Sequence, residues 1–243
     1  MISMTPRKHI PISLTLLTPA VAILVTLAVG AGIFGLLGFS PLGSLYTFFV
    51  APISRPDQIG DLFVKACPLI ITATGLVFCF RANVWNIGAE GQLIFGAIFS
   101  GWVALNFPDW PAIILMPAMI LASIIGGICW AMIPALLKVK FNTNEILVSL
   151  MLTYVAALFI DWLVRGPWRD PMSFGFPLTK MYSDSGLIQR IDLPFVGTLG
   201  QLHWGVIGAL LLAVAGGFVL SRTILGFQIK VIGDAPRAGR FAG

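Results

Sequence analysis

The residues best suited to chemistry lie in one short run, from Phe80 to Gln92. Its polar side chains are those of Arg81, Asn83, Asn86, Glu90 and Gln92. Amides and a carboxylate of this kind can hydrogen-bond the hydroxyl groups of a neutral ligand in place of water. They suit a strongly anionic ligand poorly, because such a ligand would need an arginine or a helix N-terminus.

Apolar runs flank this segment at 66–80 and 93–107, and each is about 15 residues long, against the roughly 20 needed to cross a bilayer. Ionisable groups at membrane depth are costly and usually face a water-filled path or a polar partner. Short apolar segments interrupted by glycine also build the binding sites of transport proteins. The residues predicted to line such a path are Asn83, Asn86, Glu90 and Gln92. The alternative is an ordinary polar loop between two helices, outside the membrane.

Within this predicted path, Glu90 is the one carboxylate. A carboxylate at membrane depth needs a polar partner. We expect Glu90 to be held by a polar partner such as Asn83 or Gln92.

The composition of the chain sets its fold class. Hydrophobic residues are 58% and charged residues 10% of the chain, whereas about 25% of a typical soluble domain is charged. Such a chain cannot cover a surface that faces water. Its apolar stretches are 16–39, 66–80, 93–107, 112–137, 146–164 and 202–221. We expect an all-α, polytopic transmembrane bundle of about six spans, with a broken helix around 80–92, in a single domain that covers 1–243.

No set of residues suited to catalysis or metal binding stands out. The sequence has no GxxxxGK[ST], HExxH or CxxC motif. Cys67, Cys79 and Cys129 lie in apolar runs, where we expect small core side chains and not disulfide or metal partners. His9 is near the N-terminus and His203 is at the edge of a span. We therefore expect a non-catalytic chain without a cofactor or a metal.

The net charge of +5 comes from scattered residues, which do not form the basic stripe of a nucleic-acid-binding surface. These residues instead predict the orientation of the chain, because cytoplasmic loops are enriched in Lys and Arg. An orientation with Arg7 and Lys8 inside places most of the basic residues in the cytoplasm after six crossings. We expect a cytoplasmic N-terminus, a cytoplasmic 222–243 segment and an external 165–200 loop.

A second polar segment, 141–145, precedes the apolar run that begins with 146–154. Asn142 or Thr143 can cap the start of a helix, and Glu145 in its first turn suits the positive end of the helix dipole. Simple capping at the membrane boundary is sufficient to explain this pattern.

The last segment, Gly226–Gly243, follows a span directly. Asp234 can cap a helix, and Pro236 fits its first turn. We predict a short, basic, amphipathic helix that begins there. Its residues include Asp234, Pro236, Arg237, Ala238, Gly239 and Arg240. The alternative is a basic segment that rests on anionic lipid.

These segments together resemble the permease subunits of ATP-binding-cassette importers. The resemblance rests on Phe80–Gln92, Asn144–Ile146, Met151–Leu152, Arg165–Pro171, Gly175–Pro177 and Gly226–Gly243. The branch that they resemble most transports nucleosides and simple sugars, and is related to ribose and branched-chain amino acid permeases. The run from Asn86 to Gln92 is the specific element.

The resemblance implies a subunit of a four-part pump in the plasma membrane, the inner membrane of a bacterium. Two permeases, identical or paralogous, form the path; two cytoplasmic ATP-binding subunits drive it; and an external binding protein delivers the substrate. The broken-helix segment would be Asn83–Gln92, and the segment that couples to the ATPase about Asp234–Gly243. Relatives continue through several more spans, so the chain looks like the first two-thirds of such a subunit. Thr153 stands where relatives often carry Asn.

Two other interpretations stay open from the sequence. The first is a secondary transporter or channel that works alone, which would need a coupling-ion site, with Glu90 as the only plausible carboxylate at membrane depth. The second is a truncated remnant that inserts in the membrane without transporting. Dependence on a partner ATPase distinguishes these interpretations from the importer.

Overall fold

The computed structural model describes residues 12–193, 197–235 and 239. Contacts between residues divide the chain into two compact units. The first unit comprises Met1–Phe63 and Asp192–Leu202, and the second comprises Val64–Ile191 and His203–Gly243. The prediction of a single domain stays a prediction, and each unit is described on its own.

The first unit contains one long helix, two short helices, the start of another helix and most of a strand pair. Its elements are α1 (Ile12–Leu36), α2 (Pro41–Phe49), α3 (Ala51–Ser54), the start of α4 (Pro56–Arg81), and most of the hairpin formed by β1 (Arg190–Leu193) and β2 (Gly197–His203). α2 begins at Ser40, whose Oγ accepts the backbone N–H of Gly43 at 3.3 Å. The backbone N–H of Gln201 donates to Oδ1 of Asp61 at 2.8 Å, which attaches β2 to the first turns of α4.

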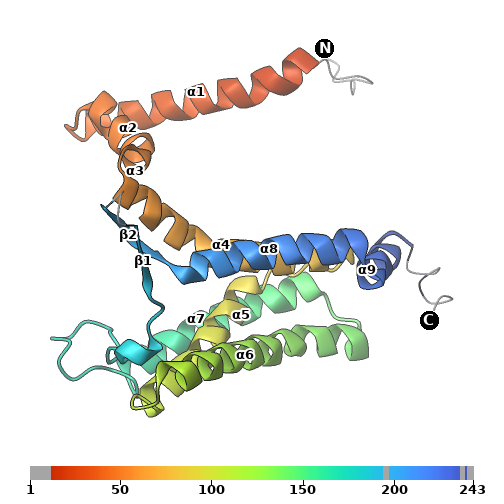
Figure 1. Cartoon of the computed structure of the whole chain (residues 1–243). Helices are drawn as coiled ribbons and strands as arrows, with labels where there is room; N and C mark the ends of the chain where they lie inside the picture. Colours follow the sequence, from red (N-terminus) through yellow and green to blue (C-terminus); the bar gives the residue numbers. More distant parts are fainter. Residues whose placement is uncertain (1–11, 194–196, 236–238, 240–243) are drawn as a thin grey trace. The chain divides into compact units, whose positions relative to one another are not determined.

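The second unit is a bundle of antiparallel helices. It contains the rest of α4, then α5 (Ala89–Asn106), α6 (Ala112–Phe141), α7 (Glu145–Arg165), the short 3₁₀ helix η1 (Asp184–Gly186), α8 (Trp204–Arg222) and α9 (Ile224–Asp234). From α4 to α8, consecutive helices run in opposite directions between the same two ends (Figure 1). One end carries 82–88, 142–144 and α9, and the other carries the long connection between α7 and α8.

Among the described residues, five helices are long and apolar enough to cross a membrane: α1 from Leu17, α4, α6, α7 and α8. This confirms the predicted all-α membrane bundle. The expected span at 93–107 is α5, whose 18 residues cover about 27 Å. Its polar ends lower its hydropathy, and its buried residues are Gly91, Gly96, Ile98, Gly101, Val103 and Ala104. α5 packs against both α6 and α7.

The length of α4 corrects one expectation. The apolar run 66–80 looked too short to span a bilayer, but the helix begins at Pro56 and has 26 residues. Proline suits the first turn of a helix, and Asp57 suits its positive dipole end. The helix continues through Pro68, which membrane helices tolerate when neighbouring groups satisfy the freed backbone.

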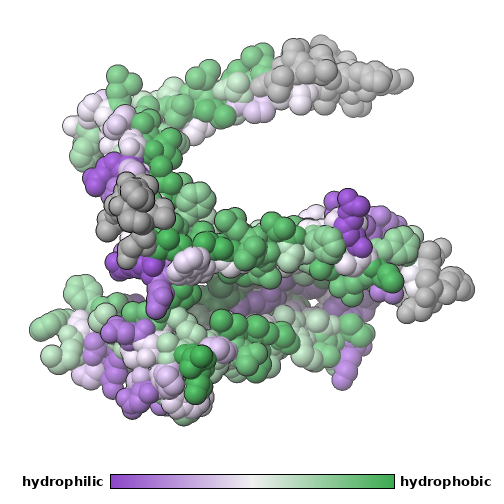
Figure 2. All heavy atoms as spheres, viewed as in Figure 1, coloured by the Kyte–Doolittle hydropathy of each residue, from purple (hydrophilic) through white to green (hydrophobic). Residues whose placement is uncertain are grey.

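The surface of the bundle is as apolar as a lipid-facing surface requires. Figure 2 shows apolar side chains along α6 and α8 and more hydrophilic ones at the long connection between α7 and α8. Ile113 is 83% exposed and Val214 is 71% exposed. Leu115 and Ala156, by contrast, are fully buried. Small side chains in the interior let the helices approach closely.

The contact of α5 with α6 depends on Gly126, and its neighbour Gly127 provides a matched control. A Cβ at position 126 would lie 2.6 Å from the carbonyl oxygen of Phe95 and 2.8 Å from Cγ of Phe99. A Cβ at position 127 would meet only the carbonyl oxygen of Gln92, at an ordinary 3.5 Å. We expect Gly126→Ala to destabilise the bundle by about 1–3 kcal/mol because of this overpacking. Gly127→Ala should leave stability unchanged or slightly raised.

Thermal unfolding in detergent measures the stability of both purified variants against that of the unaltered protein. Equal unfolding temperatures for the two variants would contradict this account of the interface between α5 and α6.

Candidate functional site

The predicted path begins where α4 ends, in a Schellman motif. The backbone N–H of Asn83 donates to the carbonyl of Phe80 at 3.1 Å, and that of Val84 donates to the carbonyl of Cys79 at 2.9 Å. Asn83 has a φ of 57°, a left-handed conformation that asparagine tolerates better than most residues. Its exposed side chain accepts the indole N–H of Trp85 at 3.3 Å. Asn83 thus ends a helix, and its side chain does not line either of the cavities described below.

Asn86 and Gln92, in contrast, form a reciprocal amide pair. Nδ2 of Asn86 donates to Oε1 of Gln92 at 3.2 Å, and Nε2 of Gln92 donates to Oδ1 of Asn86 at 3.3 Å. Oδ1 of Asn86 also accepts the backbone N–H of Gly88 at 3.0 Å, a side-chain turn just before α5. Both side chains are partly buried. Each NH₂ group carries a second hydrogen that can be donated to a ligand.

The amide pair lies between two neighbouring cavities. One of about 520 Å³ lies among α4, α5 and α6, where Thr72 and Ser123 add hydroxyl groups. The other, of about 350 Å³, reaches the turn between α6 and α7. Residues that line both are Cys79, Asn86, Gln92 and Ala131. Cavities of this size are typical of sites for small molecules.

Glu90 does not have the partner that we expected. It is exposed in the first turn of α5, and within the described part of the chain it forms no hydrogen bond or ion pair. The predicted bracing by Asn83 or Gln92 is wrong, because these amides pair with Trp85 and Asn86 instead. Glu90 also belongs to no described group of three or more His, Cys, Asp or Glu residues that could hold a metal.

Ser149, which no local sequence pattern singled out, holds the segment before α5. This α7 residue is only 3% exposed. Its Oγ accepts the backbone N–H of Ile87 at 3.2 Å and donates to the carbonyl of Ile146 at 3.2 Å. A Cβ at Gly88 would lie 2.8 Å from Cβ of Ser149, so the two chains touch there. The only feature of the sequence that could have indicated this role is that Ser149 is a hydroxyl residue within an apolar run.

The turn between α6 and α7 has different capping residues from those expected. Asn142 ends α6 with a φ of 50°, and Asn144 caps α7 by accepting a first-turn backbone N–H at 3.0 Å. The prediction that Asn142 or Thr143 caps this helix is wrong, because a three-residue turn uses its first asparagine for the left-handed position. Glu145 lies in the first turn as predicted, and its Oε2 pairs with Nζ of Lys138 at 2.8 Å.

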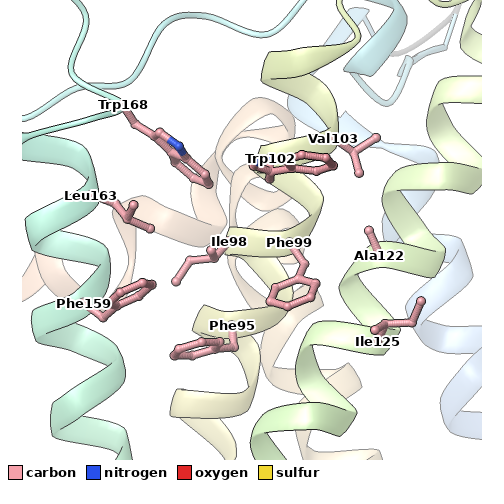
Figure 3. A pocket seen from close by; sticks show the side chains of 10 residues that line it. All are labelled: Phe95, Ile98, Phe99, Trp102, Val103, Ala122, Ile125, Phe159, Leu163 and Trp168. Atoms are coloured by element: carbon pink, nitrogen blue, oxygen red, sulfur yellow. The ribbon is translucent and has the colours of Figure 1, made fainter.

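A third cavity, of about 600 Å³, lies near the other end of α5 and is apolar. Figure 3 shows its aromatic side chains: Phe95, Phe99 and Trp102 from α5, Phe159 from α7, and Trp168 from the connection after α7. Trp168 and Tyr182 also pack against Gly101 of α5. Burial raises the pKa of the Tyr182 hydroxyl. This cavity offers no polar contact comparable with the amide pair.

The predicted coupling segment follows a helix that the sequence analysis did not separate from it. α9 is capped by Thr223, whose Oγ1 accepts the backbone N–H of Gly226 at 3.2 Å. Asp234 is the last residue of α9, so the prediction that it caps a new helix is wrong. The backbone N–H of Gly239 donates to the carbonyl of Ala235 at 3.0 Å, the spacing of a helical turn. The predicted residues outside the described part of the chain are Pro236, Arg237, Ala238 and Arg240.

Comparison with known proteins gives named relatives over the whole chain. It is 34% identical over 247 residues to the glucose ABC transporter permease protein TsgB13 of Haloferax volcanii, which covers 100% of this chain and 64% of that protein. It is 31% identical over 229 residues to the guanosine ABC transporter permease protein NupP of Bacillus subtilis, with 94% and 64% covered. It is 28% identical over 229 residues to the nucleoside ABC transporter permease protein NupB of Lactococcus lactis, with 93% and 63% covered.

The chain therefore spans less than two thirds of the length of these relatives. No solved structure matches it. Residues 58–243, which include most of α4, all of α5 to α9 and the amide pair, match the family described as "Branched-chain amino acid transport system / permease component". The chain belongs to this family of permease components.

Proposed function

We propose that this chain is the membrane-spanning permease subunit of an ATP-driven importer and forms part of the path for nucleosides or related simple sugars. The observation that carries this proposal is the Asn86–Gln92 pair, held between two cavities in a chain of this family. The names of the relatives mention glucose, nucleoside and guanosine, all of them rich in hydroxyl groups.

The charges around the two cavities favour a neutral ligand. The larger cavity has no charged residue in its described lining. The smaller one has Lys138 and Glu145, which neutralise one another across 2.8 Å. Amide groups replace water around hydroxyl groups without adding net charge. We include Glu90 and Asn83 in the proposed path segment on the strength of the resemblance alone, since neither contacts these cavities.

The proposed importer has further subunits. A cytoplasmic ATP-binding subunit hydrolyses ATP, a second permease, identical or paralogous, completes the path, and an external binding protein supplies the ligand. The coupling segment is the chain from Asp234 to Gly243, which we propose docks on the ATP-binding subunit. In this arrangement the permease is not itself an enzyme.

The orientation follows from the distribution of charge in the second unit. The end that carries α9 has the basic residues Arg81, Lys138, Lys140, Arg222 and Lys230. Acidic residues lie at both ends, as in the ion pairs Lys138–Glu145 and Arg165–Asp161, each at 2.8 Å, but the α9 end has more basic residues. Cytoplasmic loops are the ones enriched in Lys and Arg. We therefore propose that the α9 end and the N-terminus are cytoplasmic.

Uptake by the assembled importer tests the proposed function. In proteoliposomes with its ATP-binding subunit and binding protein, we expect saturable uptake of a radiolabelled nucleoside or pentose that requires ATP. Uptake that persists without ATP would instead identify a secondary transporter. An assembled complex that hydrolyses ATP but takes up neither ligand would contradict the proposed substrate class.

The amide pair can be tested in the same assay. We expect Asn86→Ala or Gln92→Ala to raise the KM for uptake up to about tenfold, since a lost hydrogen bond costs roughly 0.5–1.5 kcal/mol. The double variant should be little worse than either single one, because the two side chains act as a unit. Asn106→Ala is the matched control, since its exposed amide bonds only the carbonyl of Trp102, at 2.8 Å. Strictly additive effects, or an equal loss in the control, would contradict a role for the pair.

Cysteine labelling tests the orientation. Met181 is 92% exposed and Ile224 is 78% exposed, at opposite ends of the second unit. In a variant that lacks the native cysteines, we expect an impermeant maleimide added to intact cells to label Met181→Cys but not Ile224→Cys. Labelling of both after the membrane is permeabilised is the control. The reverse pattern in intact cells would invert the proposed topology.

A further inference from the structure

We propose that Gly233 is a joint through which the coupling segment moves the path segment at Asn86. This inference rests on the proposed function, because it assigns the means by which the ATP-binding partner reaches the amide pair. It concerns α9, which connects the last span to the coupling segment.

One face of α9 fits against the ends of two other helices. Gly226 and Gly233 are seven residues apart, which is about two helical turns, so they lie on the same face. A Cβ at Gly226 would lie 2.6 Å from Cα of Leu220, at the end of α8. A Cβ at Gly233 would overlap the carbonyl oxygen of Arg81, at the end of α4, and would lie 3.2 Å from the carbonyl carbon of Ala82.

The contact at Gly233 is between two backbones, so side-chain rotation cannot relieve a displacement there. A clash with a flexible side chain is relieved by rotation about its bonds, but Arg81 and Ala82 present main-chain atoms here. Gly233 and Ala82 are half-buried, and a close contact between main-chain atoms transmits displacement because neither side can rotate away. A shift of the last turn of α9 toward α4 therefore has to move the main chain at 81–82.

The path segment continues from these two residues and is held at its far side. The Schellman bonds join Asn83 and Val84 to the last turn of α4, and the backbone N–H of Asn86 donates to the carbonyl of Val84 at 3.2 Å. Ile87 is fixed to Ser149 of α7 at 3.2 Å. Asn86 thus lies between a joint with α9 and an anchor on α7. Movement at the joint acts on the Asn86 amide, whose bonds to Gln92 at 3.2 and 3.3 Å can then break.

The coupling segment is attached closely enough to drive this joint. The backbone N–H of Gly239, in the coupling segment, donates to the carbonyl of Ala235, the residue directly after α9, at 3.0 Å. A Cβ at Gly239 would lie 3.4 Å from Cγ1 of Ile232, in the last turn of α9. Force applied at the coupling segment therefore reaches the turn that contains Gly233.

Gly233→Ala in the complete transporter tests the joint, with Gly217→Ala as the matched control. Gly217 is a helical glycine of α8 with no atom within 4 Å of its Cβ position. We expect Gly233→Ala to lower the ligand taken up per ATP hydrolysed by about tenfold, which is typical of coupling between sites. The control should match the wild type. Equal coupling ratios for the two variants would overturn the proposal.

A second measurement keeps the test independent of assembly and of transport. In a cysteine-free background, Val84→Cys places a reactive thiol in the path segment at a site that is 44% exposed. Adding Gly233→Ala should change its labelling rate, and adding Gly217→Ala should not. A changed rate in a chain whose importer transports neither nucleosides nor sugars would support the joint and reject the proposed function. An unchanged rate in a transporting wild-type background would reject the joint alone.

Discussion

A backbone amide outside a helix must find another hydrogen-bond partner, and residues 82–88, which turn the chain from α4 back into α5, contain several such amides. The second unit satisfies them one by one. Asn83 and Val84 donate to the last turn of α4, Gly88 donates to the side chain of Asn86, and Ile87 donates to Ser149. The polar side chains here therefore serve mainly as hydrogen-bond acceptors for these backbone N–H groups. Asn86 does so and still faces two cavities, which is why it is central to the site.

This requirement also determines how α7 and α5 pack. Ser149 reaches the break only because Gly88 has no side chain and α7 starts immediately after a tight turn at Asn142. The start of α7 in turn brings Glu145 to Lys138 at the edge of the smaller cavity. The same few residues thus build the interruption, close the turn and set the charge around the site. A substitution that alters one of these three features would therefore also alter the other two.

The sequence was sufficient to predict an all-α membrane bundle, because composition dictates it. The predicted broken helix around 80–92 is instead a polar turn between the antiparallel helices α4 and α5. The sequence also predicted that Asn86 and Gln92 line a path, although it did not predict that their side chains hydrogen-bond to one another. Local pattern could not show that α4 begins at Pro56, since Asp57, Lys65 and Pro68 hide the start of the helix. Ser149 and Gly233 were missed because their partners lie far away in the sequence. The choice between Asn142 and Asn144 as helix caps depends on the length of the turn, which is a property of the fold.

The bond between Asp61 and Gln201 has a consequence for the biogenesis of the chain. The two residues are 140 positions apart, and their bond is 2.8 Å long. At about 5–20 residues per second, the ribosome takes on the order of ten seconds to make the chain between them. During that interval the Asp61 carboxylate has no β2 strand to bind and must stay hydrated at the start of α4. The β2 hairpin therefore completes the first unit late, after the spans from α4 to α7 have been synthesised.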